Sequence, residues 1–379
     1  MFSKGRPGGW NGLQSAHQRS LGYRLQAQWI GVMKSYDCIV LHNTACISDR
    51  ADCEEKPNPA YVLREDAVAV AESLRELGFH PYSFLVERFS RDLIQVLLDV
   101  SPKFVFNLCE EIEGNSELEM YVAGLLELME IPYTGSRPFA LGLALNKFYV
   151  KQILRSAGIP TPRGYLRFPG QKSPLPRGMR APVIVKPSRE DASLGINSHS
   201  ICRTPGQIEK QISYIHKVYK QEALVEEYLE GREFNVSIMG RKNPEVLAIS
   251  EIDFSGLPEG EPKIVSYRAK WDEESPLFSA TIPICPAKLS KRLENRINRI
   301  ALRSYQCIGC RDYARVDMRT DARGGLYVLE VNPNPDISPS AGFARAARTA
   351  GYSYPEMIMR ISEAAMERGA DVAPVVYAI

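Results

Sequence analysis

Three oxygen-bearing side chains stand late in the chain, in two short runs that alternate as strands do. Asp317 lies in Tyr-Ala-Arg-Val-Asp-Met, and Glu330 and Asn332 lie in Leu-Glu-Val-Asn-Pro. Glu330 and Asn332 are two residues apart, so in a strand both project from the same face. The turn at 321–325 predicts a hairpin that brings Asp317 beside them. Because Mg²⁺ prefers such oxygens, we predict a magnesium site for bound phosphates, with a solvated hairpin face as the alternative.

Charged residues also stand where apolar strands are expected to end. Lys186 closes the run Pro-Val-Ile-Val-Lys before a polar loop, so its ammonium could meet phosphate oxygens, although an ordinary solvated lysine is the simpler interpretation. The stretch 224–233 is typical of a strand that enters a short hinge. The hinge backbone could bond an adenine, and Glu233 beyond it could hold a ribose hydroxyl.

The composition is that of a globular protein. The chain has 379 residues, of which 44% are hydrophobic and 24% charged, with a net charge of +2. This length predicts two or three domains. Four of the 47 basic residues lie in the first 32 positions, which hold no acid, so the remainder has 43 basic against 45 acidic residues. That balance argues against a nucleic-acid or membrane partner, and no apolar run reaches the 18 or so residues of a membrane helix. We therefore expect a cytoplasmic protein.

Residues 1–32 are rich in Gly, Gln, Ser and Arg. We expect them to form a disordered extension outside the fold. Met33 as the true start and an organelle-targeting segment are two alternatives that the sequence leaves open.

The eight cysteines are scattered rather than arranged in a dense framework, which predicts reduced thiols. Cys307 and Cys310 form a Cys-x-x-Cys pair, but no second pair or nearby histidines complete a zinc site. We interpret this pair as structural.

Alternating patterns divide the rest of the chain into three parts, 33–135, 136–227 and 228–379. In the first part, strands alternate with helices, which predicts a doubly wound parallel-sheet domain. Its strands are expected at 37–41, 81–86 and 103–107, and its helices at 61–77, 90–98 and 118–129. In the second part, helices are expected at 147–156 and 205–219, and strands at 182–186 and 223–227. In the third part, strands are expected at 233–239, 245–253, 263–267, 314–319 and 325–331, and helices at 289–305, 341–350 and 354–368.

Together these motifs resemble the ATP-grasp enzymes and, among them, the D-alanine–D-alanine ligases, over about residues 104–368. The resemblance is carried by the stretches at 131–136, 145–147, 183–190, 225–234, 269–270 and 329–333. It implies α/β and α+β architecture, an ATP-grasp fold whose two lobes clamp ATP beside the N-terminal domain. It also implies an ATP-dependent ligase that activates a carboxylate as an acyl phosphate, joins it to an amine and releases ADP and phosphate.

The resemblance further implies roles for individual residues. It assigns cofactor binding to Lys147, Lys186, Glu226, Glu227, Tyr228, Leu229, Glu233 and Lys270, and catalytic roles to Arg315, Lys270 and Ser193. It implies that Asp317, Glu330 and Asn332 bind two Mg²⁺ ions, with Mn²⁺ as an alternative. Small carboxylate and amine molecules are the implied substrates, and a homodimer is the implied assembly.

Departures from the family pattern gather at the substrate end of the predicted site. They lie at 42–49, at 107–116, at Ala192 and Ser193 in the mobile loop, at Trp271, and at Ala341, where Ser338 or Ser340 could substitute. Changed hydrogen-bond partners predict changed ligands, because an unpaired buried carboxylate is costly. We therefore expect small amino-acid-like substrates other than two D-alanines. The alternatives are a D-alanine–D-alanine ligase proper, a non-catalytic ATP-binding regulatory module, and a kinase that phosphorylates a hydroxyl.

Overall fold

The computed structural model describes residues 33, 35–43, 64–171, 175–191, 193–272 and 274–371, with side chains as far as Arg368. The predicted extension at 1–32, most of the departure at 42–49, and Ala192 lie outside these residues. No helix in the described ranges is long and apolar enough to cross a membrane. The cysteines within these ranges are all free thiols, as the sequence predicts.

The first domain is a small parallel sheet in the order β2-β1-β3, with strands Cys38–His42 (β1), Pro81–Leu85 (β2) and Phe104–Leu108 (β3). Alternate residues of β1 face opposite sides. One set packs with α2 (Glu65–Glu76), and the other packs with α3 (Arg91–Val100) and α4 (Glu119–Leu128). Because both faces are buried, β1 is apolar throughout. The predicted doubly wound domain is confirmed.

Two helices lead from this domain to the second sheet, α5 (Pro138–Leu145) and α6 (Lys147–Ser156). The sheet is antiparallel in the order β4-β7-β5-β6, with strands Gly164–Arg167, Ala223–Glu227, Val183–Pro187 and Ile201–Cys202 respectively. The helix α7 (Pro205–Val218) covers one face by packing on Val183, Val185 and Val225. The other face carries Lys186 and Glu226.

The third sheet has five antiparallel strands in the order β10-β9-β8-β11-β12. The strands are Ile282–Ile284 (β10), Glu245–Asp253 (β9), Glu233–Gly240 (β8), Asp312–Thr320 (β11) and Leu326–Asn332 (β12). The long helix α10 (Lys291–Ile308) covers one face, together with α6, by packing on apolar residues that alternate along β8 and β11. The residues between them point to the opposite face. There Tyr313 and Met239 pack against apolar residues of the two C-terminal helices, and the predicted functional side chains lie farther along the strands.

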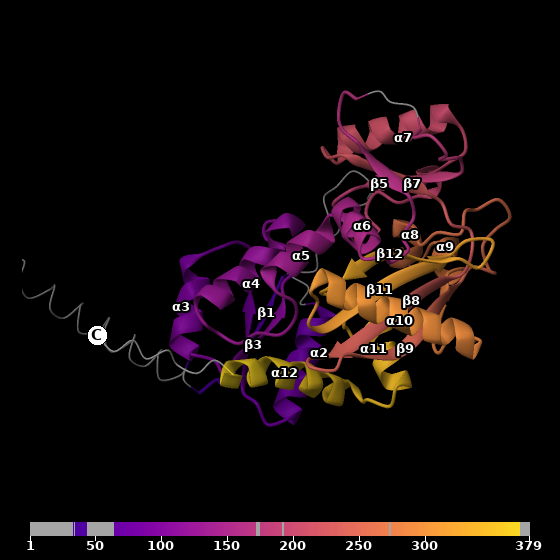
Figure 1. Cartoon of the computed structure of the whole chain (residues 1–379). Coiled ribbons are helices and arrows are strands. Elements are labelled where there is room, and N and C mark those ends of the chain that lie inside the picture. The colour runs from indigo at the N-terminus through magenta and orange to yellow at the C-terminus, as the bar shows by residue number, and fades with distance from the viewer. Residues whose placement is uncertain are drawn as a thin grey trace, which may run out of the picture.

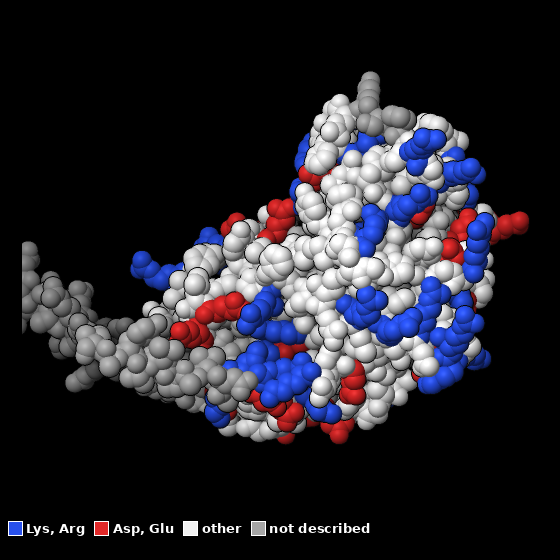
Figure 2. All heavy atoms as spheres, in the orientation of Figure 1, with Lys and Arg blue, Asp and Glu red and all other residues white. Residues whose placement is uncertain are grey.

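The chain ends by returning to the first domain. The helices α11 (Gly342–Thr349) and α12 (Tyr354–Asp371) form one apolar core with α2, β1 and β3. Figure 1 shows the lobe of α7 at the top, the large sheet behind α10, and α12 running below the first domain. Figure 2 shows basic side chains over α10 in the same view. Because the last lobe and the first domain share this core, they hold each other in place, and the bounds of the three predicted parts stay a prediction.

The prediction of a strand at 263–267 is wrong. This segment is a loop that ends at Ser266, whose side chain accepts a hydrogen bond from the N–H of Ala269 and so caps the short helix α8 (Tyr267–Trp271). A second short helix, α9 (Pro276–Ser279), follows. Pro262 interrupts the segment and Ser266 is a good helix cap, so local chemistry explains the difference.

Candidate active site

A β-bulge in the predicted hairpin brings the three oxygen-bearing side chains together. Strands β11 and β12 pair so that Asp317 lies opposite Glu330, and the register shifts between Asp317 and Met318. Leu326 and Val328 face the core, as does Val331. The extra residue, Leu329, therefore turns Glu330 and Asn332 to the face opposite the α10 core, where the amide of Asn332 donates to Oδ2 of Asp317 at 3.0 Å.

Arg315 and Asp317 share this face of β11 and form a bidentate pair. Nε of Arg315 donates to Oδ1 of Asp317 at 2.8 Å, and Nη2 donates to Oδ2 at 2.9 Å. Oδ1 also accepts from Asn235 at 2.7 Å, directly across the sheet on β8. With the bond from Asn332, each of the two Asp317 oxygens accepts two hydrogen bonds. Burial raises the pKa of Asp317, although Arg315 opposes this change.

Lys147 connects the hairpin to the loop that follows β5. Its ammonium lies 2.7 Å from Oδ1 of Asp191 and 3.5 Å from Oε2 of Glu330, and its side chain is only 4% exposed. Asn146 caps α6 by accepting from Tyr149 N–H, so Lys147 begins the helix. Burial alone would raise the pKa of Glu330, but the surrounding cations, first of all Lys147, hold it well below its usual range.

Lys186 forms part of a buried group of charges between the two sheets. Its ammonium lies 2.6 Å from Oε1 of Glu226, and Lys151 lies 3.1 Å from Oε2 of the same carboxylate. Lys151 also donates to the carbonyl of Leu329, the extra residue of the bulge. The bulge frees this carbonyl from strand pairing, so Lys151 stabilises the feature that turns Glu330 toward the site.

Lys151 provides a pH test of this buried group. Burial lowers its pKa to about 8, although Glu226 opposes this change. Since a lysine in the unfolded chain has a pKa of about 10.4, between these two values the unfolded chain binds more protons and stability rises with pH. We expect the unfolding free energy of the wild type, relative to Lys151→Met, to rise by on the order of 1 to 2 kcal/mol from pH 7.5 to 9.5. Urea unfolding at both pH values measures it, and a constant difference would show that Lys151 keeps its proton.

The predicted hinge follows β7, and its side chains point in different directions. Glu227 pairs with Arg163 at 2.5 Å, on the face of β7 opposite to Glu226, so the structure does not bring its carboxylate to Lys151 and Lys186. The hydroxyl of Tyr228 donates to the carbonyl of Lys263 at 3.1 Å. Leu229 is buried, and within the described part of the chain its N–H donates no hydrogen bond. An unsatisfied N–H at the mouth of a site is available to a ligand.

Glu233, at the start of β8, lies on the same face of the sheet as Asp317. Oε2 accepts a hydrogen bond from Arg319 at 2.9 Å. Both side chains are nearly buried, with 11% and 4% exposed.

Lys270 and Ser193 belong to two neighbouring segments, a short helix and a turn. Lys270 lies on α8, with its ammonium 4.8 Å from the ring centroid of Trp271. Burial lowers its pKa, and the nearby Arg315 lowers it further, so Lys270 faces the hairpin. The turn that begins at Ser193 is tied to α8 by a bond from Tyr267 N–H to Ile196 O at 3.1 Å. A cavity of about 310 Å³ lies beside this junction, but neither Lys270 nor Ser193 lines it.

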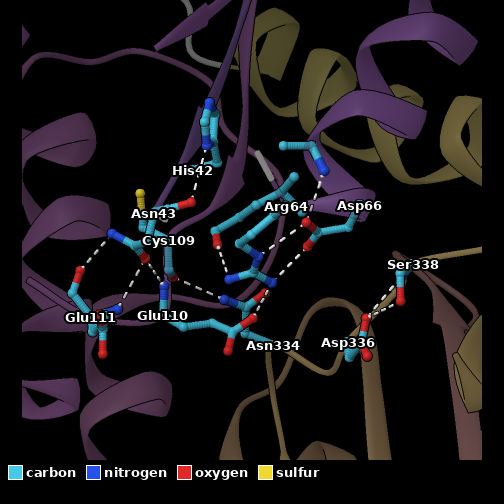
Figure 3. A network of polar contacts seen from close by, with 12 residues as sticks. His42, Asn43, Arg64, Asp66, Cys109, Glu110, Glu111, Asn334, Asp336 and Ser338 are labelled. Atoms are coloured by element: carbon cyan, nitrogen blue, oxygen red, sulfur yellow. Dashed lines mark hydrogen bonds and ion pairs between the residues drawn. The ribbon is translucent and has the colours of Figure 1, made fainter. Parts of the chain in front are cut away.

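A polar network lies at the predicted substrate end of the site, where the first domain meets the loop after β12 (Figure 3). The amide of Asn43 accepts from the N–H of Glu110 at 2.7 Å and donates to the carbonyl of Val86 at 2.6 Å. Arg64 pairs with Asp66 at 2.6 Å and also with Glu110. These contacts hold the ends of β1 and β3 together.

Asn334 joins this network to the last lobe. It donates to the carbonyl of Cys109 and to Oε1 of Glu119, both at 3.0 Å, and accepts from the hydroxyl of Tyr313 at 2.8 Å. Asp336 accepts from the hydroxyl of Ser338 at 2.6 Å. Burial raises the pKa of Glu119 well above its usual value. This network therefore combines charged and amide groups of the first domain and of the last lobe.

The structure thus gathers most of the predicted residues on two facing surfaces. The group comprises Lys147, Lys186, Glu226, Glu233, Lys270, Arg315, Asp317, Glu330 and Asn332. Sequence reasoning missed Lys151, Asn235 and Arg319. Their signals were present, since Lys151 follows Lys147 by one helical turn, and Asn235 and Arg319 follow Glu233 and Asp317 by two strand positions.

This arrangement, two antiparallel sheets that face each other with lysines on one side and an acidic hairpin on the other, defines an ATP-grasp fold. The crystal structure of D-alanine–D-alanine ligase from Bacillus anthracis complexed with ATP superposes with a TM-score of 0.67. The match covers 89% of this chain and 100% of that chain at 21% identity. The predicted fold class is confirmed.

Residues 172–363 match the family D-ala D-ala ligase C-terminus. D-alanine–D-alanine ligase from Carboxydothermus hydrogenoformans is 34% identical over 249 residues, which cover 63% of this chain and 75% of that protein. The uncharacterized protein y4sG of Sinorhizobium fredii is 37% identical over 266 residues, covering 70% and 75% respectively. The chain therefore belongs to the D-alanine–D-alanine ligase family, whose members are ATP-grasp enzymes that form carbon–nitrogen bonds. The predicted resemblance is confirmed.

Proposed function

We propose that this protein joins a small carboxylate to an amine of amino-acid-like substrates other than two D-alanines, through an acyl phosphate and with release of ADP and phosphate. The observation that carries the proposal is the bidentate pair of Arg315 and Asp317, at 2.8 and 2.9 Å, opposite Glu330 on the open face. Phosphoryl transfer depends on positioning and charge neutralisation, which a surface of lysines, carboxylates and an arginine supplies.

ATP is the cofactor we assign to the space between the two sheets. Lys147 and Lys186 are buried cations that would neutralise its phosphates. The free N–H of Leu229 would bond the adenine, and Glu233 would hold the ribose. Each lysine now pairs with a carboxylate, Lys147 with Asp191 and Lys186 with Glu226. Phosphate oxygens of bound ATP would replace these carboxylates as partners of the two ammonium groups.

The oxygen donors of the hairpin fit Mg²⁺. Among the described residues, no three His, Cys, Asp or Glu side chains cluster as a metal site. The candidate set instead combines the two carboxylates of Asp317 and Glu330 with the amide of Asn332. Hard oxygen donors of this kind suit a cation that also binds phosphate. Mg²⁺ bound there would neutralise charge on the transferred phosphoryl group.

Arg315 is assigned to the second half of the reaction. Two of its nitrogens hold Asp317, and no hydrogen bond from Nη1 occurs within the described part of the chain, so the N–H groups of Nη1 would be available to a substrate. An oxyanion forms when the amine attacks the acyl phosphate, and a fixed guanidinium stabilises it without reorganising. A module that only bound ATP would not require this group.

The changed substrate end favours changed substrates. Trp271 is half exposed beside Lys270, and the network of Arg64, Glu110 and Asn334 closes the first-domain side. Because unpaired polar groups in such a pocket are costly, these groups select a ligand that complements them. The names of the relatives favour a D-alanine–D-alanine ligase proper as the second candidate.

The test is phosphate release from Mg²⁺-ATP against a matrix of paired amino acids and small carboxylates, with products identified by mass. We expect release with at least one pair and a product joined by a new amide bond. Release with D-alanine alone would establish the second candidate. A stable phosphorylated product would indicate a kinase, and no release with any pair would contradict the proposal.

A further inference from the structure

A buried arginine that the proposed reaction does not use lies at the nucleotide end of the site. Arg319 is 4% exposed, and it follows Arg315 and Asp317 along the same face of β11. An arginine is almost never buried to this extent unless its donors are satisfied. Its contacts therefore indicate what it is there to hold.

Arg319 donates hydrogen bonds to three separate segments around the proposed nucleotide pocket. Nη1 donates to Oε2 of Glu233 at 2.9 Å, and Nε donates to the carbonyl of Gly231 at 3.3 Å. Nη2 donates to the carbonyl of Lys263, in the loop before α8. One side chain thus joins β8, the hinge and the loop that leads to Lys270.

Two aromatic rings fix the plane of the guanidinium. Its central carbon lies 5.3 Å from the ring centroid of Tyr228 and 5.3 Å from that of Phe254. Tyr228 also donates to the carbonyl of Lys263. Stacking on aromatic faces and a rigid fork of donors are properties that lysine lacks, so the site requires arginine.

The backbone also fixes the positions of Arg319 and Glu233. Arg319 and Glu233 are direct partners across β11 and β8. The hinge is also attached to β11 by two backbone hydrogen bonds. Gly231 N–H donates to Thr320 O, and Thr320 N–H donates to Arg232 O, both at 2.9 Å. The orientation of Glu233 is therefore set by β11 and not only by its own rotamer.

We propose that Arg319 is a positioning residue for nucleotide recognition: it holds Glu233 as an oriented carboxylate with Oε1 presented to the ribose hydroxyls. The inference rests on the proposed function, because it takes the space between the sheets as the ATP site. Within the described part of the chain, Arg319 occupies Oε2 and nothing donates to Oε1 of Glu233.

The electrostatics support a need for this arginine. Burial raises the pKa of Glu233, and Asp317 and Glu330 raise it further, while Arg319 is the largest opposing influence. A protonated Glu233 would accept hydroxyl hydrogen bonds less well. Arg319 thus favours the charged form that a ribose requires.

The test is equilibrium binding of Mg²⁺-ATP, 2′-deoxy-ATP and 3′-deoxy-ATP to the full chain by calorimetry, which does not depend on knowing the substrates. For the wild type we expect the deoxy analogues to bind about tenfold more weakly than ATP, or about 1.4 kcal/mol. For Arg319→Met we expect ATP binding to weaken about tenfold. We also expect the ratio of the affinities for ATP and for the deoxy analogues, which measures discrimination, to fall to about one. Arg323→Met, an exposed arginine on the β11–β12 turn, is the matched control and should match the wild type.

Further variants separate positioning from folding. Arg319→Lys should fold and keep the charge but lose the fork, so discrimination should fall between that of the wild type and that of Arg319→Met. Glu233→Gln should lose discrimination, and adding Arg319→Met to it should weaken ATP binding no further. If both Arg319 variants still discriminated ATP from the deoxy analogues as the wild type does, the inference would be overturned and the proposed function would stand. A wild type that does not bind Mg²⁺-ATP would overturn both the inference and the proposed nucleotide site.

Discussion

Arg315→Ala lowers kcat by about 10²- to 10³-fold in the proposed reaction while ATP affinity stays within about threefold, because the guanidinium is assigned to an oxyanion that exists only along the reaction path. Both partners of the pair are mostly buried, with 20% and 8% of their side chains exposed. The arginine is therefore held before substrate arrives. Steady-state kinetics with the productive substrate pair and calorimetry with Mg²⁺-ATP measure the two quantities.

The controls for this variant address the partner that it leaves behind. Removing Arg315 leaves Asp317 without its cation, so its pKa rises further and a part of the loss could come from the metal ligand. Arg315→Lys retains a positive charge but not the bidentate geometry, and we expect it to recover only a part of the lost kcat. Arg323→Ala controls for the loss of an exposed arginine. An unchanged kcat in Arg315→Ala would remove its assigned role.

Strand periodicity predicted which side chains share one face of the hairpin, but it did not predict the β-bulge that brings both pairs to the same face. Arg315 and Asp317 are two residues apart, and so are Glu330 and Asn332, so each pair was placed on one face. Whether the two pairs share that face depends on the bulge at Leu329. Leu329 is an ordinary apolar residue with no turn signal, and its carbonyl is satisfied by Lys151, far away in sequence. Such long-range compensation is not visible in a single sequence.

The helices show the same division between local and long-range causes. The helix α7 is capped by Thr204, whose side chain and that of Gln207 bond reciprocally with the backbone, a signature readable from sequence. By contrast, α5 was missed because its sequence, Pro-Phe-Ala-Leu-Gly-Leu-Ala-Leu, is apolar on every side. Amphipathic periodicity cannot appear in a helix with no polar face.

At the candidate site, chemical type was predictable and pairing was not. The family resemblance indicated which lysines and carboxylates to expect in the site, whereas the residues alone favoured a solvated Lys186. It did not indicate that Glu226 binds two lysines or that Glu227 turns outward to Arg163. Neighbouring residues of one strand point to opposite faces, so only one of the two glutamates could enter the site, and strand register decides which.

The second large effect is expected at Asp317. Its hydrogen bonds allow a test of whether it binds the metal or only orients Arg315. Its two oxygens accept four hydrogen bonds, from Arg315, Asn235 and Asn332. A metal ion must therefore compete with these donors for the lone pairs of Asp317. Of the three donor residues, Asn332 is the one predicted to bind the metal, because rotation of its amide would replace the donor N–H with the side-chain oxygen as a ligand. Asp317→Asn keeps the volume and removes the charge.

We expect Asp317→Asn to lower turnover by at least about 10³-fold and to raise the Mg²⁺ concentration needed for half-maximal turnover, since a neutral amide is a weaker ligand for a hard cation. The measurement is phosphate release against Mg²⁺ concentration at saturating ATP. Asn235→Ala is the matched control, because it removes one hydrogen bond to Asp317 but no charge, and we expect a loss below about tenfold without a change in Mg²⁺ dependence. If Asp317→Asn reduced turnover with an unaltered Mg²⁺ dependence, Asp317 would serve to orient Arg315 and the metal would lie elsewhere.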